Sequence, residues 1–346
     1  MRAIVISLLA AAMALTFAGC ASSRQSMSQS QRAQAAAKPS PVAGLCKSPD
    51  APPADLANKP GYQQFDVSVV DASGQPISGL TRQDFIVYEN SRSFPVAYFR
   101  EHKNDEPAAI ALVVDTSGSM EPKLPIVKES LVGFVTNLNR CDELILFAFT
   151  GTTYLLMPFS TDHKMAAEKI ERLHAYGQTA IFDASRTALQ SLAVADYTNR
   201  AIILITDGID NSSIAEEKDV VEQARKDRVP IYAVGIGDPN AKGQREVAIG
   251  PYVMGTDDSS RVDAKSLKDL AGSAGGRSFI VPATAEDGGK GFKDAIIAIA
   301  NSIAQGYAIG ATIPADATLS NVNVMIANRP DAVVRARPIA ASAQHD

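Results

Sequence analysis

The chain has 346 residues, of which 46% are hydrophobic and 21% are charged, so most of it is expected to fold around buried cores. The formal net charge is −5, no basic stretch is present and Trp is absent, which argues against nucleic acid as the main partner and against an aromatic platform for sugars. Three Cys and four scattered His exclude a zinc-finger framework and a disulfide-dense scaffold.

An export signal is predicted at the N-terminus. Arg2 supplies a positive start, and the apolar run from Ala3 to Ala18 is too short and too rich in Ala to span a bilayer comfortably. The run ends Phe17-Ala18-Gly19-Cys20, which resembles the end of a bacterial lipoprotein signal. The resemblance implies that Cys20 is the acylated first residue of the mature protein and that Ala21 sorts it to the outer membrane. The alternative is an ordinary cleaved signal in which Cys20 is incidental.

A segment rich in Ser, Gln, Ala and Pro follows, up to about residue 59. Such a segment cannot bury enough apolar surface to offset its conformational entropy, so a flexible tether is expected. With Cys20 assigned to the anchor, Cys46 and Cys141 remain as an even pair in an oxidising compartment. Two alternatives stay open: a Cys46–Cys141 disulfide that staples the tether to the main domain, or two unpaired thiols.

Two segments with strand patterns and no helical period flank the centre of the chain. Alternating or apolar runs bounded by turn residues predict strands at 65–70, 85–88, 96–99, 306–313 and 322–326. The simplest arrangement joins the C-terminal strands to the N-terminal ones in one small β-rich module. The domain between them would then be an insertion.

Strands and helices alternate in that central part. Ala109–Val114 is a continuous apolar run, typical of a strand buried on both faces. Further strands are predicted at 144–149, 154–159, 201–206, 231–236 and 277–281, and helices at 124–138, 162–173, 180–194, 216–228, 264–272 and 291–304. This order predicts an α/β fold, a doubly wound and mostly parallel sheet with helices on both faces. Residues 238–263 form a polar, Gly-rich excursion without a predicted element.

An inserted α/β domain is therefore the expected organisation. The predicted parts are a signal peptide at 1–19, a lipid-anchored linker at 20–59, a β-rich module at 60–104, the α/β domain at 107–305, strands completing the module at 306–338, and a tail at 339–346.

Side chains that bear oxygen follow the buried strands of this domain. Asp115, Ser117 and Ser119 occupy every second position of the loop after the first strand, and Asp207 follows a later strand. Thr179 lies on a loop that enters a helix. Open α/β sheets bind ligands outside the carboxyl ends of their strands, where the strand order reverses. If these two strands are adjacent at that reversal, the oxygens come together.

Two carboxylates and three hydroxyls form a hard oxygen set, which suits Mg²⁺, or Mn²⁺ or Ca²⁺, better than zinc or copper. Neutral hydroxyls leave the positive charge of the cation underused, so an acidic side chain of another molecule is expected to complete its coordination. That chemistry is a metal-bridged contact in which no bond is broken. The alternative for each residue alone is structural: Asp115 and Asp207 as caps, Ser117 and Ser119 as turn formers.

In order and context these residues resemble the metal-ion-dependent adhesion site of the von Willebrand factor type A domain, whose signature is Asp-x-Ser-x-Ser, then Thr, then Asp. The similarity covers about 107–305, and the flanks resemble those of bacterial proteins in which such a domain is inserted in a β-rich module. The resemblance implies that Ser117, Ser119 and Thr179 ligate the cation, and that the two Asp residues often act through water. It also implies that the partner is another protein, and the lipoprotein-like signal at Cys20 adds the expectation that the protein is anchored in a membrane.

Enzymatic motifs are absent from the sequence. It has no Gly-x-Ser-x-Gly elbow, no phosphate-binding Gly-Lys-Ser/Thr loop and no His-Glu-x-x-His helix. A phosphoaspartyl loop would need a second Asp where Ser117 stands. We therefore expect neither an enzyme nor a small-molecule substrate. Two alternatives remain, a structural component of an envelope assembly with a non-essential metal site and a metal-dependent hydrolase.

Other polar residues are interpreted as structural. Asp210-Asn211 is expected to form a solvated turn, and Asp257-Asp258 to be exposed charges of a loop. His163 and His174 are expected on the surface of one helical stretch.

Overall fold

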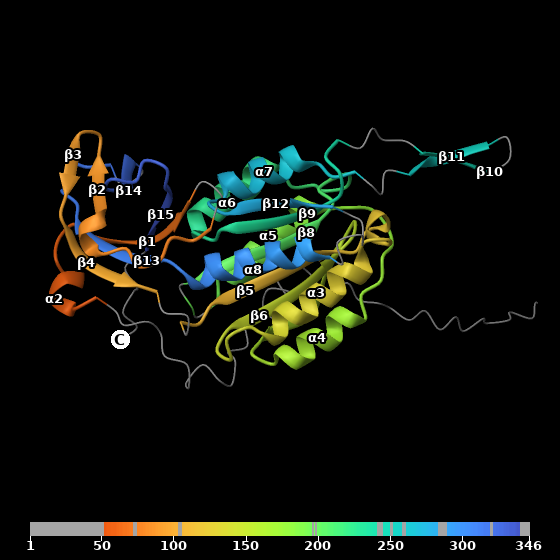
Figure 1. Cartoon of the computed structure of the whole chain (residues 1–346), viewed down its shortest axis with the longest axis horizontal. Helices are drawn as coiled ribbons and strands as arrows, with labels where there is room; N and C mark the ends of the chain where they lie inside the picture. The colour runs from red at the N-terminus through yellow and green to blue at the C-terminus, as the bar shows by residue number, and fades with distance from the viewer. Residues whose placement is uncertain are drawn as a thin grey trace, which may run out of the picture.

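The computed structural model describes residues 52–339, except 72–74, 103–105, 196, 198, 241–244, 250–251, 258–260, 283–288 and 319–320. The predicted signal, Cys20, Cys46 and most of the predicted linker lie outside this part. Within it, a β module and an α/β domain lie end to end (Figure 1).

A six-stranded sheet forms the centre of the α/β domain. Its strand order is β12-β9-β8-β5-β6-β7, and every neighbouring pair is parallel except β6 and β7. The strands are β5 (Ala109–Asp115), β6 (Glu143–Phe149), β7 (Thr153–Ser160), β8 (Arg200–Thr206), β9 (Ile231–Ile236) and β12 (Arg277–Val281). The chain runs outward from β5 to β6 and β7 and then returns to β8 on the other side of β5, so the strand order reverses between β5 and β8.

Helices cover both faces of this sheet because successive side chains of each buried strand point to opposite faces. Ile110 and Leu112 pack against α3 (Leu124–Thr136), α4 (His163–Glu171) and α8 (Lys290–Ala304). Ala111 and Val113 face α5 (Ile181–Leu192), α6 (Glu217–Asp227) and α7 (Ala264–Ser273). The predicted α/β fold with helices on both faces is confirmed. Among the described residues, no helix has the length and apolar character needed to cross a bilayer.

The β module is assembled from both flanks of the chain. One sheet has the order β15-β1-β13-β4 and the other β14-β2-β3. The strands are β1 (Tyr62–Val70), β2 (Phe85–Glu89), β3 (Arg92–Phe94), β4 (Val96–Glu101), β13 (Tyr307–Thr312), β14 (Val322–Ile326) and β15 (Val333–Ile339), and a 3₁₀ helix, η1 (Arg82–Asp84), precedes β2. Because β1 pairs with both β13 and β15, the C-terminal strands complete the N-terminal sheet, as the fold prediction required.

Some elements were not predicted. Residues 238–263, expected to lack regular structure, contain an antiparallel hairpin of β10 (Arg245–Ile249) and β11 (Tyr252–Asp257), which extends away from the domain in Figure 1. β-branched residues on both sides of a Gly-Pro pair favour this hairpin over a loop. A helical turn, α2 (Ala54–Ala57), lies inside the predicted linker, where Asp55 in its first turn complements the helix dipole. Strand β15 was also missed.

The disulfide prediction concerns Cys141, which is buried just before β6 and is disulfide-bonded. Its predicted partner, Cys46, lies outside the described residues, so the pairing stays a prediction.

We expect peptide mapping without reductant to recover a linked Cys46–Cys141 pair, because acylation would occupy Cys20. Reduction should then lower the free energy of unfolding by about 4.7 kcal/mol, the effect that loop-closure entropy gives for a loop near 100 residues. Alkylation of both cysteines without reductant would contradict the pairing.

Candidate metal site

Three loops meet at the carboxyl edge of the sheet because β5 and β8 are adjacent and parallel. The first loop (116–123) follows β5 and contains a short 3₁₀ helix, η2 (Gly118–Met120). The second loop (172–180) joins α4 to α5, and the third loop (207–216) follows β8. Every predicted site residue except Asp115, which ends β5, lies on one of these loops.

Backbone hydrogen bonds tie the second loop to the first. The Gly118 N–H donates to the Gly177 carbonyl at 3.1 Å, and the Tyr176 N–H donates to the Thr116 carbonyl at 2.7 Å. A left-handed Gly177, with φ near +80°, lets the second loop turn at this contact. These backbone hydrogen bonds therefore hold the second loop beside the Asp-x-Ser-x-Ser segment without the help of a ligand.

Asn211 ties the third loop to the second. Its N–H donates to the Thr179 carbonyl at 3.0 Å, and its side-chain Oδ1 accepts from the Thr179 N–H at 2.9 Å. Asp210 accepts from Ser213 and from the Phe182 N–H at the start of α5. Asp210 and Asn211 lie in an irregular segment in which Asn211 is exposed, in line with the predicted solvated turn, and their side chains also hold the loop that carries Thr179 to the third loop.

Asp115 is buried and hydrogen-bonded through both carboxylate oxygens. Oδ1 accepts from the Ser117 N–H at 2.8 Å, and Oδ2 accepts from the Thr206 hydroxyl of β8 at 2.6 Å. The hydroxyls of Ser117 and Ser119 lie 3.2 Å apart. Asp115 therefore fixes its own loop and couples that loop to the neighbouring strand.

Asp207 is buried and only partly satisfied. Its Oδ2 lies 3.3 Å from the Nζ of Lys123, whose side chain is fully buried. Its Oδ1 is buried and has no hydrogen-bond partner among the described residues. Because a buried carboxylate oxygen without a partner costs free energy, this atom points to a ligand.

The two carboxylates repel each other. Burial, and then the charge of Asp207, raise the pKa of Asp115 from 3.8 to about 7. A positive charge between them would therefore favour the ionised form of the pair.

The donor set fits a divalent cation of the Mg²⁺ class. Two carboxylates, two adjacent serine hydroxyls and the buried Thr179 supply oxygen ligands only, which is the preference of hard cations. Among the described residues, no group of three or more His, Cys, Asp or Glu side chains is arranged to hold a metal ion. The structure thus gathers Asp115, Ser117, Ser119 and Asp207, and it fixes Thr179 on the adjoining loop.

Sequence reasoning missed three supporting residues: Lys123, Thr206 and Asn211. Lys123 stands in a polar segment just before α3, so it resembles a solvated residue. Thr206 and Asn211 act through hydrogen bonds between segments far apart in sequence, for which one sequence carries no signal.

The two histidines lie apart from one another and do not share a helix. His163 begins α4 and its Nε2 lies 2.9 Å from the Asp142 carbonyl. His174 lies beyond the end of α4, in the second loop, where its ring stacks on Tyr176. The expectation of one shared helical stretch is therefore wrong.

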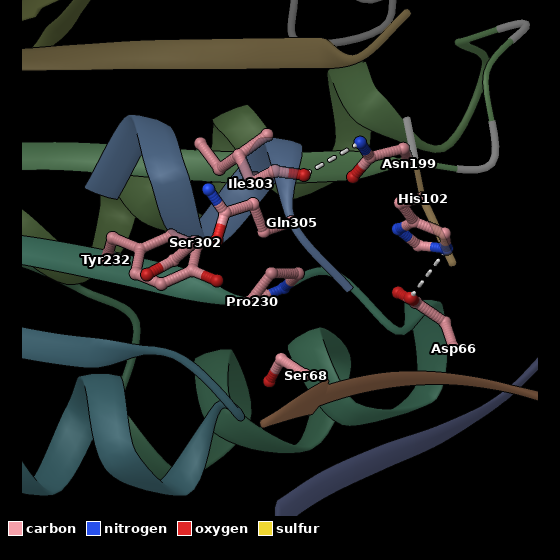
Figure 2. Close-up of a pocket in the computed structure, with 10 residues that line it drawn as sticks. Asp66, Ser68, His102, Asn199, Pro230, Tyr232, Ser302, Ile303 and Gln305 are labelled. Carbon is pink, nitrogen blue, oxygen red and sulfur yellow. Dashed lines mark hydrogen bonds and ion pairs between the residues drawn. The ribbon is translucent and has the colours of Figure 1, made fainter. Parts of the chain in front are cut away.

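A separate hollow lies at the opposite edge of the sheet, where the α/β domain meets the β module (Figure 2). Asn199, before β8, donates to the Ile303 carbonyl of α8 at 3.1 Å, and His102 lies 3.7 Å from Asp66 of β1. None of the candidate metal-site residues lines this hollow. The hollow lies at the junction between the α/β domain and the β module, and it is separate from the candidate metal site.

Comparison with known proteins gives a family match. The family model of the von Willebrand factor type A domain matches residues 109–287, just over half of the chain. An uncharacterized protein of Borreliella burgdorferi is 28% identical over 140 residues, which cover 38% of this chain and 41% of that protein. The uncharacterized protein YfbK of Escherichia coli is 29% identical over 179 residues, which cover 48% of this chain and 31% of that protein. The chain thus spans less than half the length of these two relatives.

Among solved structures, the chain is similar to a von Willebrand factor type A protein from Catenulispora acidiphila. The identity is 18% and the TM-score 0.46, and the match covers 63% of this chain and 52% of that one. This likeness concerns the fold alone.

The raised pKa of Asp115 predicts how pH changes stability without a metal. The folded chain keeps this proton up to about pH 7, whereas the unfolded chain releases it near its ordinary pKa of 3.8. In chelator, the contribution of Asp115 to the free energy of unfolding should therefore fall by a few kcal/mol between about pH 4 and pH 7. Urea unfolding of wild type and Asp115→Asn across this range checks it. The Asn variant should lack that part of the pH dependence, and identical pH profiles would contradict the assignment.

Proposed function

The chain belongs to the von Willebrand factor type A family, and we propose that it binds a protein partner through a divalent cation at the carboxyl edge of its central sheet. The observation that carries the proposal is the buried, unpartnered Oδ1 of Asp207. Asp207 lies on the third loop, directly after β8, and β8 is adjacent to β5. Asp115 ends β5, and the hydroxyls of Ser117 and Ser119 on the following loop lie within hydrogen-bond distance of each other. An apolar filling of this edge would leave that oxygen without compensation.

In this proposal Ser117, Ser119 and Thr179 hold the cation, while Asp115 and Asp207 balance its charge, directly or through water. The cation supplies an electrophilic position for one more oxygen ligand. Because three of the protein ligands are neutral, a carboxylate of the partner is the favoured last ligand. Mg²⁺ is the proposed ion because it accepts a mixed shell of protein oxygens and waters, and Mn²⁺ or Ca²⁺ could replace it.

Exposed apolar side chains beside the site support a protein as the partner. Tyr176 of the second loop is 49% exposed and Ile214 of the third loop is 89% exposed. Large apolar residues at this exposure are typical of binding surfaces when they surround a polar anchor. The proposed partner surface therefore presents an acidic side chain among apolar neighbours.

The remaining parts of the proposal concern location and chemistry. We place the chain in a bacterial envelope, anchored through lipid on Cys20 in the outer membrane and held by the linker at 20–59. Neither the family match nor the relatives indicate enzymatic activity, and the role proposed here requires none.

Cation binding should stabilise the folded chain. At a Mg²⁺ concentration about a hundredfold above its dissociation constant, the gain is about 2.7 kcal/mol. We expect this gain in wild type and its loss in Asp115→Ala, because the alanine removes one of two carboxylates. Thermal unfolding followed by circular dichroism measures it, since the chain has no Trp for fluorescence. Asp219→Ala, an exposed acid on α6, is the matched control and should respond as wild type. Equal responses of wild type and Asp115→Ala would remove the site.

The partner surface is tested separately from the cation. Ile214→Asp should reduce capture of the partner from envelope extracts by tenfold or more, because it places a negative charge where an acidic partner docks. Its Mg²⁺-induced stabilisation should equal that of wild type. Capture by wild type should also be lost in chelator and return with Mg²⁺. Capture that is indifferent to chelator would favour the structural alternative, in which the domain docks by shape.

A further inference from the structure

We infer that Lys123 determines which ligand the site accepts: its ammonium leaves the cation-loaded site with a net positive charge, so that a carboxylate is preferred over a neutral oxygen. The inference rests on the proposed function. Its starting observation is that Nζ of Lys123 lies 3.3 Å from Oδ2 of Asp207, with the lysine side chain 0% and the aspartate side chain 1% exposed. No other described side chain pairs with this ammonium.

The local fold holds this lysine in place. The 3₁₀ turn η2 ends at Met120, whose carbonyl accepts from the Lys123 N–H at 3.0 Å. Helix α3 begins at Leu124, directly after Lys123. The lysine side chain lies in an apolar hollow beside Val127, Ile236 and Phe292. Because its carbon chain packs among these residues, the ammonium cannot leave for solvent without opening the interface between α3, β9 and α8.

The charges of the buried groups then decide the preference. A bound divalent cation favours the ionised form of both Asp115 and Asp207, which then carry −2. With the ammonium of Lys123 at +1, the protein side of the loaded site has a charge of −1. A divalent cation brings the site to +1, and one partner carboxylate brings it to zero. Without the lysine, the loaded site would be neutral before the partner arrives, and the preference for a carboxylate over a neutral oxygen would be smaller.

The positive charge of Lys123 also affects the affinity of the site for the cation. A buried ammonium next to Asp207 repels a divalent ion through a medium of low effective dielectric constant, so Lys123 must weaken cation binding. A lysine that served only to stabilise the fold would have no reason to act on cation and carboxylate in opposite directions. Opposite effects on the two ligands are therefore the signature of the proposed role.

The experiment uses the full chain with Lys123→Met, which keeps a similar apolar length and removes the charge. Mn²⁺ is the cation probe, followed by electron paramagnetic resonance, and acetate is the carboxylate probe, followed by water proton relaxation of the Mn²⁺-loaded protein. We expect Mn²⁺ to bind about tenfold more tightly and acetate at least about fivefold more weakly than in wild type. Lys123→Arg keeps the charge and should keep the acetate affinity of wild type.

Lys128→Met is the matched control, because it removes a lysine from α3, the helix that follows Lys123, and leaves the pair of Lys123 and Asp207 intact. Both affinities should remain as in wild type. If Lys123→Met does not fold in chelator, Lys123→Gln replaces it in the same titrations. Unchanged or weaker Mn²⁺ binding together with unchanged acetate binding would overturn the role of Lys123 and leave the proposed function intact. Absence of Mn²⁺ binding to wild type would instead overturn the proposed function.

Discussion

The parallel pairing of β5 with β8 is the constraint on which the rest of the site depends. Because both strands run in the same direction at the reversal of strand order, their carboxyl ends and the loops that follow share one edge. The hydrogen bond from the Thr206 hydroxyl to Asp115 closes this arrangement across the two strands. The second loop then joins through backbone contacts at Gly118 and through Asn211. The candidate ligands are therefore positioned by the sheet and by hydrogen bonds outside the ligand set.

Burial at this edge gives the two carboxylates different surroundings. Asp115 has both oxygens satisfied by neutral donors, whereas Asp207 has one oxygen on a buried ammonium and one without a described partner. Burial, and then the charge of Asp207, raise the pKa of Asp115 even though both of its oxygens accept hydrogen bonds. A cation would relieve both conditions at once, since it pairs with the free oxygen and lowers the repulsion.

The sequence was sufficient to predict the fold, and it also predicted that Asp115, Ser117, Ser119 and Asp207 would lie at the carboxyl edge of the sheet, because both predictions rest on local patterns. The continuous apolar run of β5 indicates a doubly buried strand, and Asp-x-Ser-x-Ser directly after it fixes where the oxygens emerge. The roles of Lys123 and Asn211 could not be predicted from the sequence, for a different reason. Their roles depend on which distant segment packs beside them, and a lysine in a polar segment looks the same whether it is solvated or buried. The β10–β11 hairpin was missed because its short apolar runs lie in polar surroundings.

The insertion of the α/β domain places the β module and the candidate site at opposite edges of the central sheet. The chain enters the domain at the start of β5 and leaves it at the end of α8, and both points lie at the amino edge of the sheet, where Asn199 bonds to the last turn of α8. The β module is built on that edge (Figures 1 and 2). The three loops of the candidate site lie at the carboxyl edge, across the full length of the strands. The candidate site and the β module therefore occupy opposite edges of the central sheet, so the residues that join the two parts of the chain are not those of the candidate site.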